Sequence, residues 1–264
     1  MMIQVEQLTF SYSSQLSIFE NLDWHVGQGE AWAVIGPSGC GKSTLLYLLT
    51  GLRKPQTGRI TVAGEPVPRP SRGRTGLILQ DYGLLPWATV WDNAALGLRI
   101  RRMYGQNGTR PGPAEIAKQV DFWLQRLGID KLHAQYPGQI SGGQRQRTAI
   151  ARTLALEPDV LLMDEPFSSL DALTREDMQR LMLDLRAETG VTMVIVTHNI
   201  EEAVYLGQHI LVLQMPPNRE ARVIENPQAG HRGYRHEPAF WEKCSELRQE
   251  LDQQGRTVST GVHA

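Results

Sequence analysis

A glycine-rich segment at residues 36–43 has the residue types and spacing of a phosphate-binding loop. It reads Gly36-Pro37-Ser38-Gly39-Cys40-Gly41-Lys42-Ser43 and fits the pattern G-x-x-x-x-G-K-[ST]. Glycines let the backbone curl so that successive N–H groups point at a phosphate, and a following helix adds its positive end. Lys42 would bring its charge to the β- and γ-phosphates, and the Ser43 hydroxyl would bind Mg²⁺. The alternative is an ordinary glycine-rich turn before a helix.

Two carboxylates follow an apolar segment at residues 160–163. The sequence there is Val160-Leu161-Leu162-Met163-Asp164-Glu165-Pro166. Open α/β sheets bind ligands at the carboxyl ends of their strands, which is where this acidic pair would lie. Asp164 would hold Mg²⁺ through its water shell, while Glu165 would orient and deprotonate an attacking water. Taken alone, the pair could also be a strand leaving the core into an acidic turn.

A second candidate anion site lies at Ser141-Gly142-Gly143-Gln144, just before a helix rich in Arg and Ala. A serine hydroxyl, glycine amides and a helix N-terminus together suit a γ-phosphate. The alternative is structural, with Ser141 acting as an N-cap and the glycines as loop.

The first third of the chain is predicted to be mostly strands. Residues 3–5, 8–12 and 22–26 alternate apolar and polar side chains, which is typical of half-buried strands. Residues 31–35 form a nearly continuous apolar run, which indicates a strand buried on both faces. This strand would deliver the chain into the glycine-rich segment, and a leucine-rich helix would follow.

The middle of the chain is predicted to be a helical lobe inserted into a mainly parallel α/β core. From about residue 81 to 156 helical spacing replaces the strand pattern. Apolar strands at 160–163 and 191–196 follow, separated by a helix that Gly190 can terminate. Buried strands separated by helices favour a parallel sheet. Near the end, Pro238 opens a predicted amphipathic helix whose apolar side would carry Phe240, Trp241, Cys244, Leu247 and Leu251.

Composition limits the classes of function. With 264 residues, 41% of them hydrophobic and 21% charged, the chain can bury one substantial core. A formal net charge of -1 gives no basic field, so no nucleic-acid partner is expected. Cys40 and Cys244 have no metal-ligand or disulfide-framework spacing. Apolar runs fall far short of the roughly 20 residues that span a bilayer, so a transport role would need a separate membrane protein.

Taken in order, the motifs resemble the ATPase subunits of ABC transporters, from the N-terminal strand to about residue 225. The order is the phosphate-binding loop, Gln80, Ser141-Gly142-Gly143-Gln144, Asp164-Glu165, Ser168-Ser169-Leu170-Asp171 and Val196-Thr197-His198. The resemblance implies an α/β fold with a P-loop NTPase (RecA-like) core, an N-terminal antiparallel β subdomain and a helical subdomain at about 81–156. Residues 1–225 would form the ATPase domain, 226–252 a C-terminal extension with one amphipathic helix, and 253–264 a polar, disordered tail.

The resemblance also implies ATP and Mg²⁺ as cofactors and a role for each motif residue. Tyr12 resembles the aromatic side chain that stacks on adenine, although a core aromatic is the alternative. Gln80 is similar to a glutamine that senses Mg²⁺, and Asp171 to a residue that links the two sites of a dimer. His198 resembles a switch histidine at the γ-phosphate, with a purely structural histidine as the alternative. The implied nucleotide-binding set is Tyr12, Gly36, Pro37, Ser38, Gly39, Cys40, Gly41, Lys42, Ser43, Thr44, Gln80, Ser141, Gly142, Gly143, Gln144 and Asp171, with Ser43, Gln80 and Asp164 at the metal and Glu165, His198 and Lys42 in catalysis.

Family geometry implies partners for this chain. Each ATP would lie between the phosphate-binding loop of one subunit and the Ser141-Gly142-Gly143 segment of another, which is a second copy or a paralogous ATPase. The apolar loop Leu84-Leu85-Pro86-Trp87 would be exposed and would receive a helix of an integral membrane permease. The alternative is a loop that packs within the helical lobe.

This loop and Tyr136-Pro137-Gly138-Gln139 resemble importer subunits of the nitrate, sulfonate and taurine group, which also includes bicarbonate importers. The resemblance implies a peripheral protein at the cytoplasmic face of the cell membrane, with an extracytoplasmic solute-binding protein in the same system. The cargo would be a small anion or organic acid such as nitrate, a sulfonate or taurine. The alternatives are the ATPase of an exporter and a soluble ABC ATPase outside transport.

Overall fold

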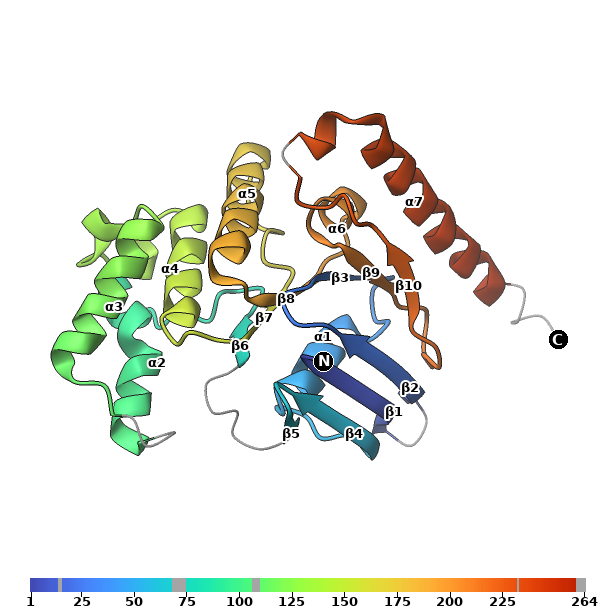
Figure 1. Cartoon of the computed structure of the whole chain (residues 1–264), viewed down its shortest axis with the longest axis horizontal. Coiled ribbons are helices and arrows are strands. Elements are labelled where there is room, and N and C mark those ends of the chain that lie inside the picture. Colours follow the sequence, from blue (N-terminus) through green and yellow to red (C-terminus); the bar gives the residue numbers. More distant parts are fainter. Residues whose placement is uncertain (14–15, 68–74, 106–109, 232, 260–264) are drawn as a thin grey trace. The chain divides into compact units, whose positions relative to one another are not determined.

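The computed structural model describes residues 1–13, 16–67, 75–105, 110–231 and 233–259 (Figure 1). The chain divides into two compact units. Unit 1 joins residues 1–70 to residues 183–264, and unit 2 holds residues 71–182.

Unit 1 contains an antiparallel four-stranded sheet in the order β2-β1-β4-β5. Its strands are β1 (Ile3–Ser13), β2 (Leu16–Val26), β4 (Thr57–Val62) and β5 (Glu65–Val67). The sequence predicted separate strands at 3–5 and 8–12, but β1 is one strand whose register shifts between Val5 and Leu8. Gln7, with φ of 49°, lies at this irregularity, which resets the alternation of buried side chains. The predicted antiparallel β subdomain is confirmed.

A second sheet places the candidate site residues of unit 1. Its central strand β3 (Ala31–Ile35) pairs in parallel with β8 (Thr192–Val196) and β9 (His209–Val212), while β10 (Arg222–Glu225) is antiparallel to β9. Every residue of β3 and β8 is buried, as the continuous apolar runs predicted. The chain leaves β3 directly into the glycine-rich segment and the helix α1 (Lys42–Leu49).

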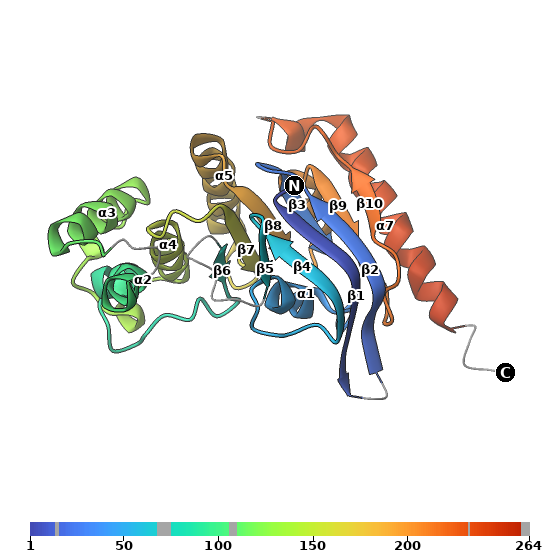
Figure 2. The same cartoon turned by 60° about the horizontal axis from the view of Figure 1, so that its bottom comes forward.

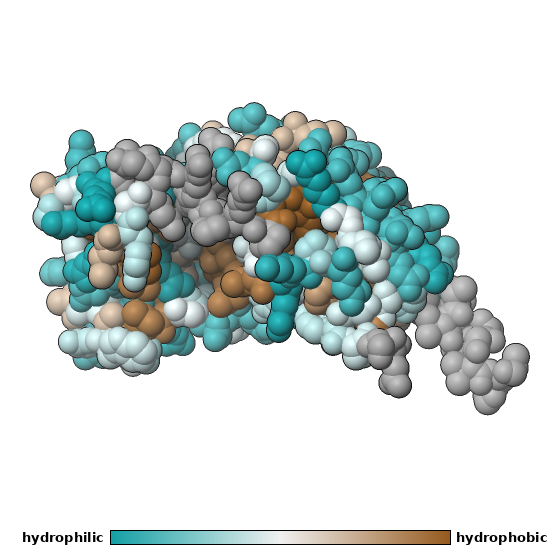
Figure 3. Space-filling view, turned by 90° about the horizontal axis from the view of Figure 1, so that it is seen from below, coloured by the Kyte–Doolittle hydropathy of each residue, from teal (hydrophilic) through white to brown (hydrophobic). Residues whose placement is uncertain are grey.

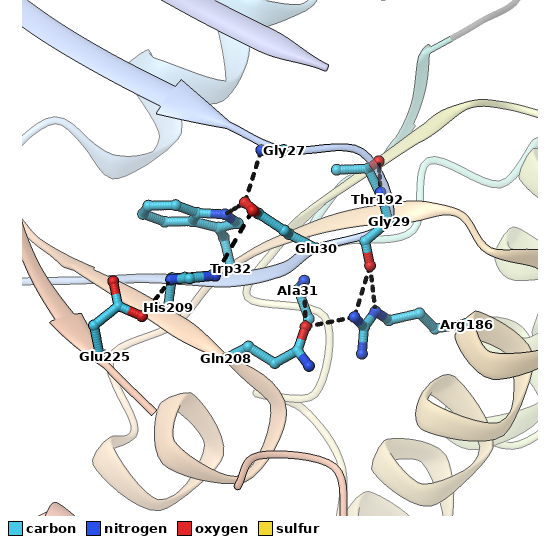
Figure 4. Close-up of polar contacts among 10 residues, drawn as sticks. All are labelled: Gly27, Gly29, Glu30, Ala31, Trp32, Arg186, Thr192, Gln208, His209 and Glu225. Carbon is cyan, nitrogen blue, oxygen red and sulfur yellow. Dashed lines mark hydrogen bonds and ion pairs between the residues drawn. The ribbon is translucent and has the colours of Figure 1, made fainter. Parts of the chain in front are cut away.

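Polar contacts fix the turn that leads into β3 (Figure 4). The Glu30 carboxylate accepts hydrogen bonds from Gly27 N and from Trp32 Nε1, both at 2.7 Å. The Arg186 guanidinium donates to the Gly29 carbonyl at 2.6 Å. Burial lowers the pKa of Arg186, while the nearby Glu30 carboxylate opposes that shift. These contacts hold the start of β3 and therefore the point from which the glycine-rich segment emerges.

Helices α6 (Ile200–Leu206) and α7 (Pro238–Ser259) cover one face of β3, β9 and β10 (Figure 1). The antiparallel sheet lies on the side away from α7 (Figure 2). The predicted C-terminal helix is present, with Phe240, Cys244 and Leu247 buried against this face. Trp241 was wrongly placed on the buried side: its side chain is 53% exposed. Since successive helical residues point about 100° apart, Phe240 and Trp241 cannot both face the sheet squarely. The helix extends to Ser259, and residues 260–264 of the predicted polar tail lie outside the described residues.

A buried hydrogen-bond network joins the segment before α7 to the chain after β10 and to the end of α6. The Tyr234 hydroxyl donates to Asn226 Oδ1 at 2.7 Å, and Asn226 Nδ2 donates to the carbonyls of Val204 and Gly207. Burial raises the pKa of the Tyr234 hydroxyl, which therefore stays a donor at neutral pH.

Unit 2 contains the parallel pair β6 (Thr75–Ile78) and β7 (Val160–Asp164). Between these strands in sequence lie α2 (Val90–Tyr104), α3 (Pro113–Arg126), η2 (Asp130–Leu132), η3 (Pro137–Gln139) and α4 (Gly142–Leu154). Helix α5 (Ala172–Thr189) begins in unit 2 and ends in unit 1. Helix ends follow local sequence: Thr89 caps α2, Gly105 ends it in a left-handed conformation, and Pro113 starts α3. The predicted inserted helical lobe is confirmed.

Among the described residues, every helix is too short or too polar to pass through a lipid bilayer. The face seen in Figure 3 is mostly hydrophilic, with brown apolar surface in a few recessed areas.

Candidate functional site

The glycine-rich segment of unit 1 folds into a tight loop that admits no side chain at two of its glycines. A Cβ atom on Gly36 would lie 2.4 Å from the Leu213 carbonyl oxygen, and one on Gly41 would lie 2.5 Å from Ile18 Cγ2. Gly41 also has φ of 107°, a left-handed conformation that favours glycine. The rim of the loop at Pro37, Ser38 and Gly39 is exposed. The glycines therefore let the loop pack closely against β2 and the chain after β9, while its tip stays exposed.

Lys42 lies inside this loop and is only 8% exposed. Its ammonium donates to the carbonyls of Gly36 and Pro37, at 2.9 Å each. The neighbouring Cys40 thiol is buried, and burial raises its pKa although the Lys42 charge opposes the shift. The carbonyls and the protonated Cys40 thiol that contact the ammonium are neutral, so the loop keeps a positive charge for an anionic ligand.

Tyr12, from β1, lies beside the start of α1. Its hydroxyl is 3.1 Å from Thr44 Oγ1, its ring is 54% exposed, and the Arg53 guanidinium lies 5.7 Å from the ring centre. The exposure disfavours the alternative of a core aromatic. Arg53 was missed by the sequence reasoning, because a cation beside a ring leaves no spacing pattern when the partners are 41 positions apart in sequence.

His198 leaves β8 at the same edge at which Gly36 leaves β3. The two strands are parallel with Val34 opposite Val196, and Thr197 N donates to the Val34 carbonyl at 3.1 Å. His198 is exposed. Unit 1 thus brings together the phosphate-binding loop, Thr44, Tyr12 and His198.

Unit 2 brings Gln80 and the acidic pair to one strand edge. In the parallel pair β6–β7, Ile78 lies opposite Met163, so Gln80 and Glu165 follow neighbouring strand ends in the same register. Asp164 is buried at 5% exposure. Glu165 has φ of 45°, an unusual left-handed conformation for a side chain other than glycine, and its carbonyl accepts from Ser168 Oγ at 3.0 Å. Backbone strain of this kind concentrates at functional sites.

Ser141 caps helix α4, as the structural alternative predicted. Its Oγ accepts from Gln144 N at 3.3 Å, and Gln144 Oε1 accepts from Ser141 N at 2.8 Å. A serine hydroxyl that accepts one bond still has its own proton to donate, so capping does not exclude a contact with phosphate. Gly143 is tightly packed, since a Cβ atom there would lie 2.7 Å from Thr174 Cγ2.

Asp171 is the N-terminal residue that caps helix α5. Its carboxylate accepts from Thr174 N at 3.1 Å, and the hydrogen bonds from Thr174 lower the pKa of this exposed carboxyl. The preceding segment is tied to the loop after β6, since the hydroxyls of Ser169 and Tyr82 are 2.7 Å apart.

The apolar loop between β6 and α2 is rigidly held by Asn93, which is fully buried. Asn93 Oδ1 accepts from Leu85 N at 2.8 Å, and its Nδ2 donates to the carbonyls of Leu85, Ala88 and Thr89. Trp87 is 74% exposed. Pro86 is exposed as predicted, but Leu84 and Leu85 are half-buried because the loop folds back onto Asn93.

Comparison with known proteins gives consistent matches. The family described as "ABC transporter" matches residues 19–168. The taurine import ATP-binding protein TauB of Pseudomonas aeruginosa is 45% identical over 203 residues, which are 77% of this chain and 74% of that protein. The aliphatic sulfonates import ATP-binding protein SsuB of Bacillus cereus is 38% identical over 229 residues, 86% of each chain.

Solved structures agree with these sequence matches. The structure of cbiO1 from Clostridium perfringens, part of the ABC transporter complex cbiONQ, is 28% identical with a TM-score of 0.74 and covers 98% of each chain. A dimeric post-hydrolysis state of the ATP-binding cassette MJ0796, bound to ADP and Pi, is 28% identical with a TM-score of 0.72, over 85% of this chain and 98% of that one.

Proposed function

Because this chain belongs to the ABC transporter family and is an ATPase that works with ATP and Mg²⁺, we propose that it powers uptake of a small sulfonate such as taurine through a separate membrane permease. The observation that carries this proposal is the similarity to the taurine and aliphatic sulfonate import proteins over most of both chains. The proposed cargo class, a small anion or organic acid, also includes nitrate.

The triphosphate is proposed to bind at the loop of residues 36–43. In support, the loop folds tightly at glycines that admit no Cβ atom, its tip is exposed, and Lys42 places its charge within it. We assign Lys42 and the amides of the loop to the phosphates, and the exposed ring of Tyr12 to the adenine, with Thr44 fixing its hydroxyl. The Arg53 guanidinium would add a cation to this end of the site.

Glu165 is the proposed general base that takes a proton from the attacking water. Its place at a strand end beside Gln80, and its left-handed backbone, support this role. Ser43, Gln80 and Asp164 are oxygen donors of the kind that Mg²⁺ prefers. Bound Mg²⁺ would offset the negative charge of the phosphates. His198 is proposed to contact the γ-phosphate.

Two ATPase chains, identical or paralogous, are proposed to act together. Ser141, with its free hydroxyl proton at the N-terminus of the 13-residue helix α4, would meet the γ-phosphate bound by the other chain, next to the amides of Gly142 and Gly143. Gln144 would hold Ser141 in place, and Asp171 would lie near the junction of the two sites. Binding of ATP would favour the closed dimer and hydrolysis would release it, which biases the permease between two arrangements.

The permease is proposed to dock at the loop of Leu84, Leu85, Pro86 and Trp87. A loop whose backbone is held by Asn93 and that exposes an indole is suited to receive a helix from a partner, because its backbone needs little further ordering on binding. The chain would then be peripheral, at the cytoplasmic face of the membrane, in a system that also has an extracytoplasmic solute-binding protein.

The test is uptake by cells that carry the chain together with a candidate membrane permease of the taurine and sulfonate class. We expect uptake of labelled taurine or an alkanesulfonate that is lost on deletion of this chain and restored by the wild type. If the chain restores uptake of nitrate alone, the cargo is nitrate and not a sulfonate. If cells preloaded with substrate release it, the chain belongs to an exporter. Co-purification of the two proteins would identify the partner directly.

A further inference from the structure

The connection between β9 and β10 packs against the back of the phosphate-binding loop. Leu213 N donates to the Ile35 carbonyl at 2.8 Å, and the Leu213 carbonyl oxygen fills the space beside Gly36. Further along, Asn218 N donates to the Ile18 carbonyl at 2.9 Å, which fastens the connection to β2. Figure 1 shows this hairpin connection running beside β2.

The Asn218 side chain bonds the loop itself. It is 3% exposed, and its Nδ2 donates to the Cys40 carbonyl at 2.9 Å and to the Ile18 carbonyl at 3.2 Å. Its Oδ1 accepts from Gln214 N at 2.7 Å. Two carbonyl acceptors on one side and an N–H donor on the other fix the orientation of the amide group.

The hydrogen bond from Asn218 to the Cys40 carbonyl bears on the direction of the next N–H group in the phosphate-binding loop, that of Gly41. In a trans peptide the C=O and N–H bonds point in opposite directions, so a Cys40 carbonyl held toward Asn218 aims the Gly41 N–H away from Asn218. Gly41 would otherwise allow this peptide to rotate, because glycine populates many backbone conformations. Binding of an anion by backbone amides depends on N–H groups that already converge on it.

We infer that Asn218 is a positioning residue for nucleotide binding, which holds the Cys40–Gly41 peptide so that the Gly41 N–H faces the phosphates. This inference rests on the proposed function of the loop. It assigns a role to a residue outside every sequence motif of the site.

The test replaces the donor with an acceptor of the same shape. In Asn218→Asp, a carboxylate oxygen would face two carbonyls, and we expect the affinity of the folded protein for Mg-ADP to fall about tenfold. We also expect faster hydrogen exchange at the Gly41 amide in the ADP complex.

Asn226→Asp is the matched control. Asn226 is 1% exposed and also donates to two backbone carbonyls, those of Val204 and Gly207, which lie outside the phosphate-binding loop. We expect this variant to lower the melting temperature but to keep wild-type affinity for Mg-ADP. Equal affinities in both variants and the wild type would overturn the inference.

Failure of the proposed function gives a different result from failure of this inference. In that case the wild type itself does not bind Mg-ADP or Mg-ATP. If Asn218→Asp does not fold, the wild type still decides the matter through its Asn218 side-chain amide protons. Slow exchange of these protons in the Mg-ADP complex supports the inference, and exchange at the rate of a free amide refutes it.

Discussion

At the scale of single residues, the site depends on backbone conformations that only certain side chains tolerate. Gly41 needs its left-handed backbone and the absence of a Cβ atom, while Glu165 adopts a left-handed backbone despite having one. Gly41 lacks room for a Cβ atom because Ile18 packs against the loop. The left-handed backbone of Glu165 is strained, which makes its proposed role in catalysis worth testing.

Substitution of Glu165 by Gln is expected to separate binding from hydrolysis. The amide keeps the shape of the side chain but cannot take a proton, so ATP should bind as in the wild type while turnover falls at least about 100-fold. The variant should accumulate as an ATP-bound dimer in size-exclusion chromatography. Glu157→Gln is the control, because Glu157 is an exposed carboxylate that also has a left-handed backbone, with φ of 52°. Unchanged turnover in Glu165→Gln would remove this residue from catalysis.

At the scale of elements, the candidate site residues lie at strand ends and helix starts. Parallel pairing brings Gly36 and His198 to one edge in unit 1, and Gln80 and Glu165 to one edge in unit 2. Loops between elements are fixed by buried asparagines, of which Asn93 and Asn218 are examples. An asparagine suits this task because its amide both donates to and accepts from the backbone.

Trp87→Ala tests whether the loop of residues 84–87 docks the membrane permease, as proposed. We expect the isolated protein to keep its ATPase activity, because the side chain is exposed and contributes little to folding. Co-purification with the permease should fall, since an exposed indole is a typical anchor of an interface. Trp241→Ala, an equally large change at an exposed indole of α7, should leave co-purification intact. Equal retention of the permease by both variants would place docking elsewhere.

At the scale of the whole molecule, the C-terminal helix completes the hydrophobic core of unit 1. Phe240, Cys244 and Leu247 pack on β3, β9 and β10, and the Tyr234–Asn226 hydrogen bond fastens the chain before the helix. Burial raises the pKa of the Cys244 thiol from its ordinary value of 9.0 to about 11. The same burial that stabilises the helix therefore keeps this thiol protonated and unreactive at neutral pH.

A dependence of stability on pH follows from this shift. Between pH 9 and about 11 the unfolded chain loses the Cys244 proton while the folded chain keeps it, so stability falls as the pH rises through this window. In Cys244→Ala, the decline should be shallower by at most about 1.4 kcal/mol per pH unit. Chemical denaturation at pH 8, 9, 10 and 11 measures the slope, and parallel curves for the two proteins would contradict the raised pKa.

The sequence by itself predicted the contiguous parts of the candidate site. The glycine-rich loop of residues 36–43, the cap at Ser141 and the acidic pair after β7 each use neighbouring residues, so local spacing already places their members side by side. The inserted helical lobe was predicted for the same reason, since helical periodicity is a local signal.

Only the tertiary structure decided which distant groups meet. Asn218 and the Cys40 carbonyl are 178 positions apart, and the order of β10, β9, β3 and β8 sets their contact. The exposure of Trp241 beside the buried Phe240, and the half-burial of Leu84 and Leu85 on Asn93, were likewise decided by packing. Hydrophobicity tells which side chains favour burial, but which of them find a partner surface depends on how remote segments pack together.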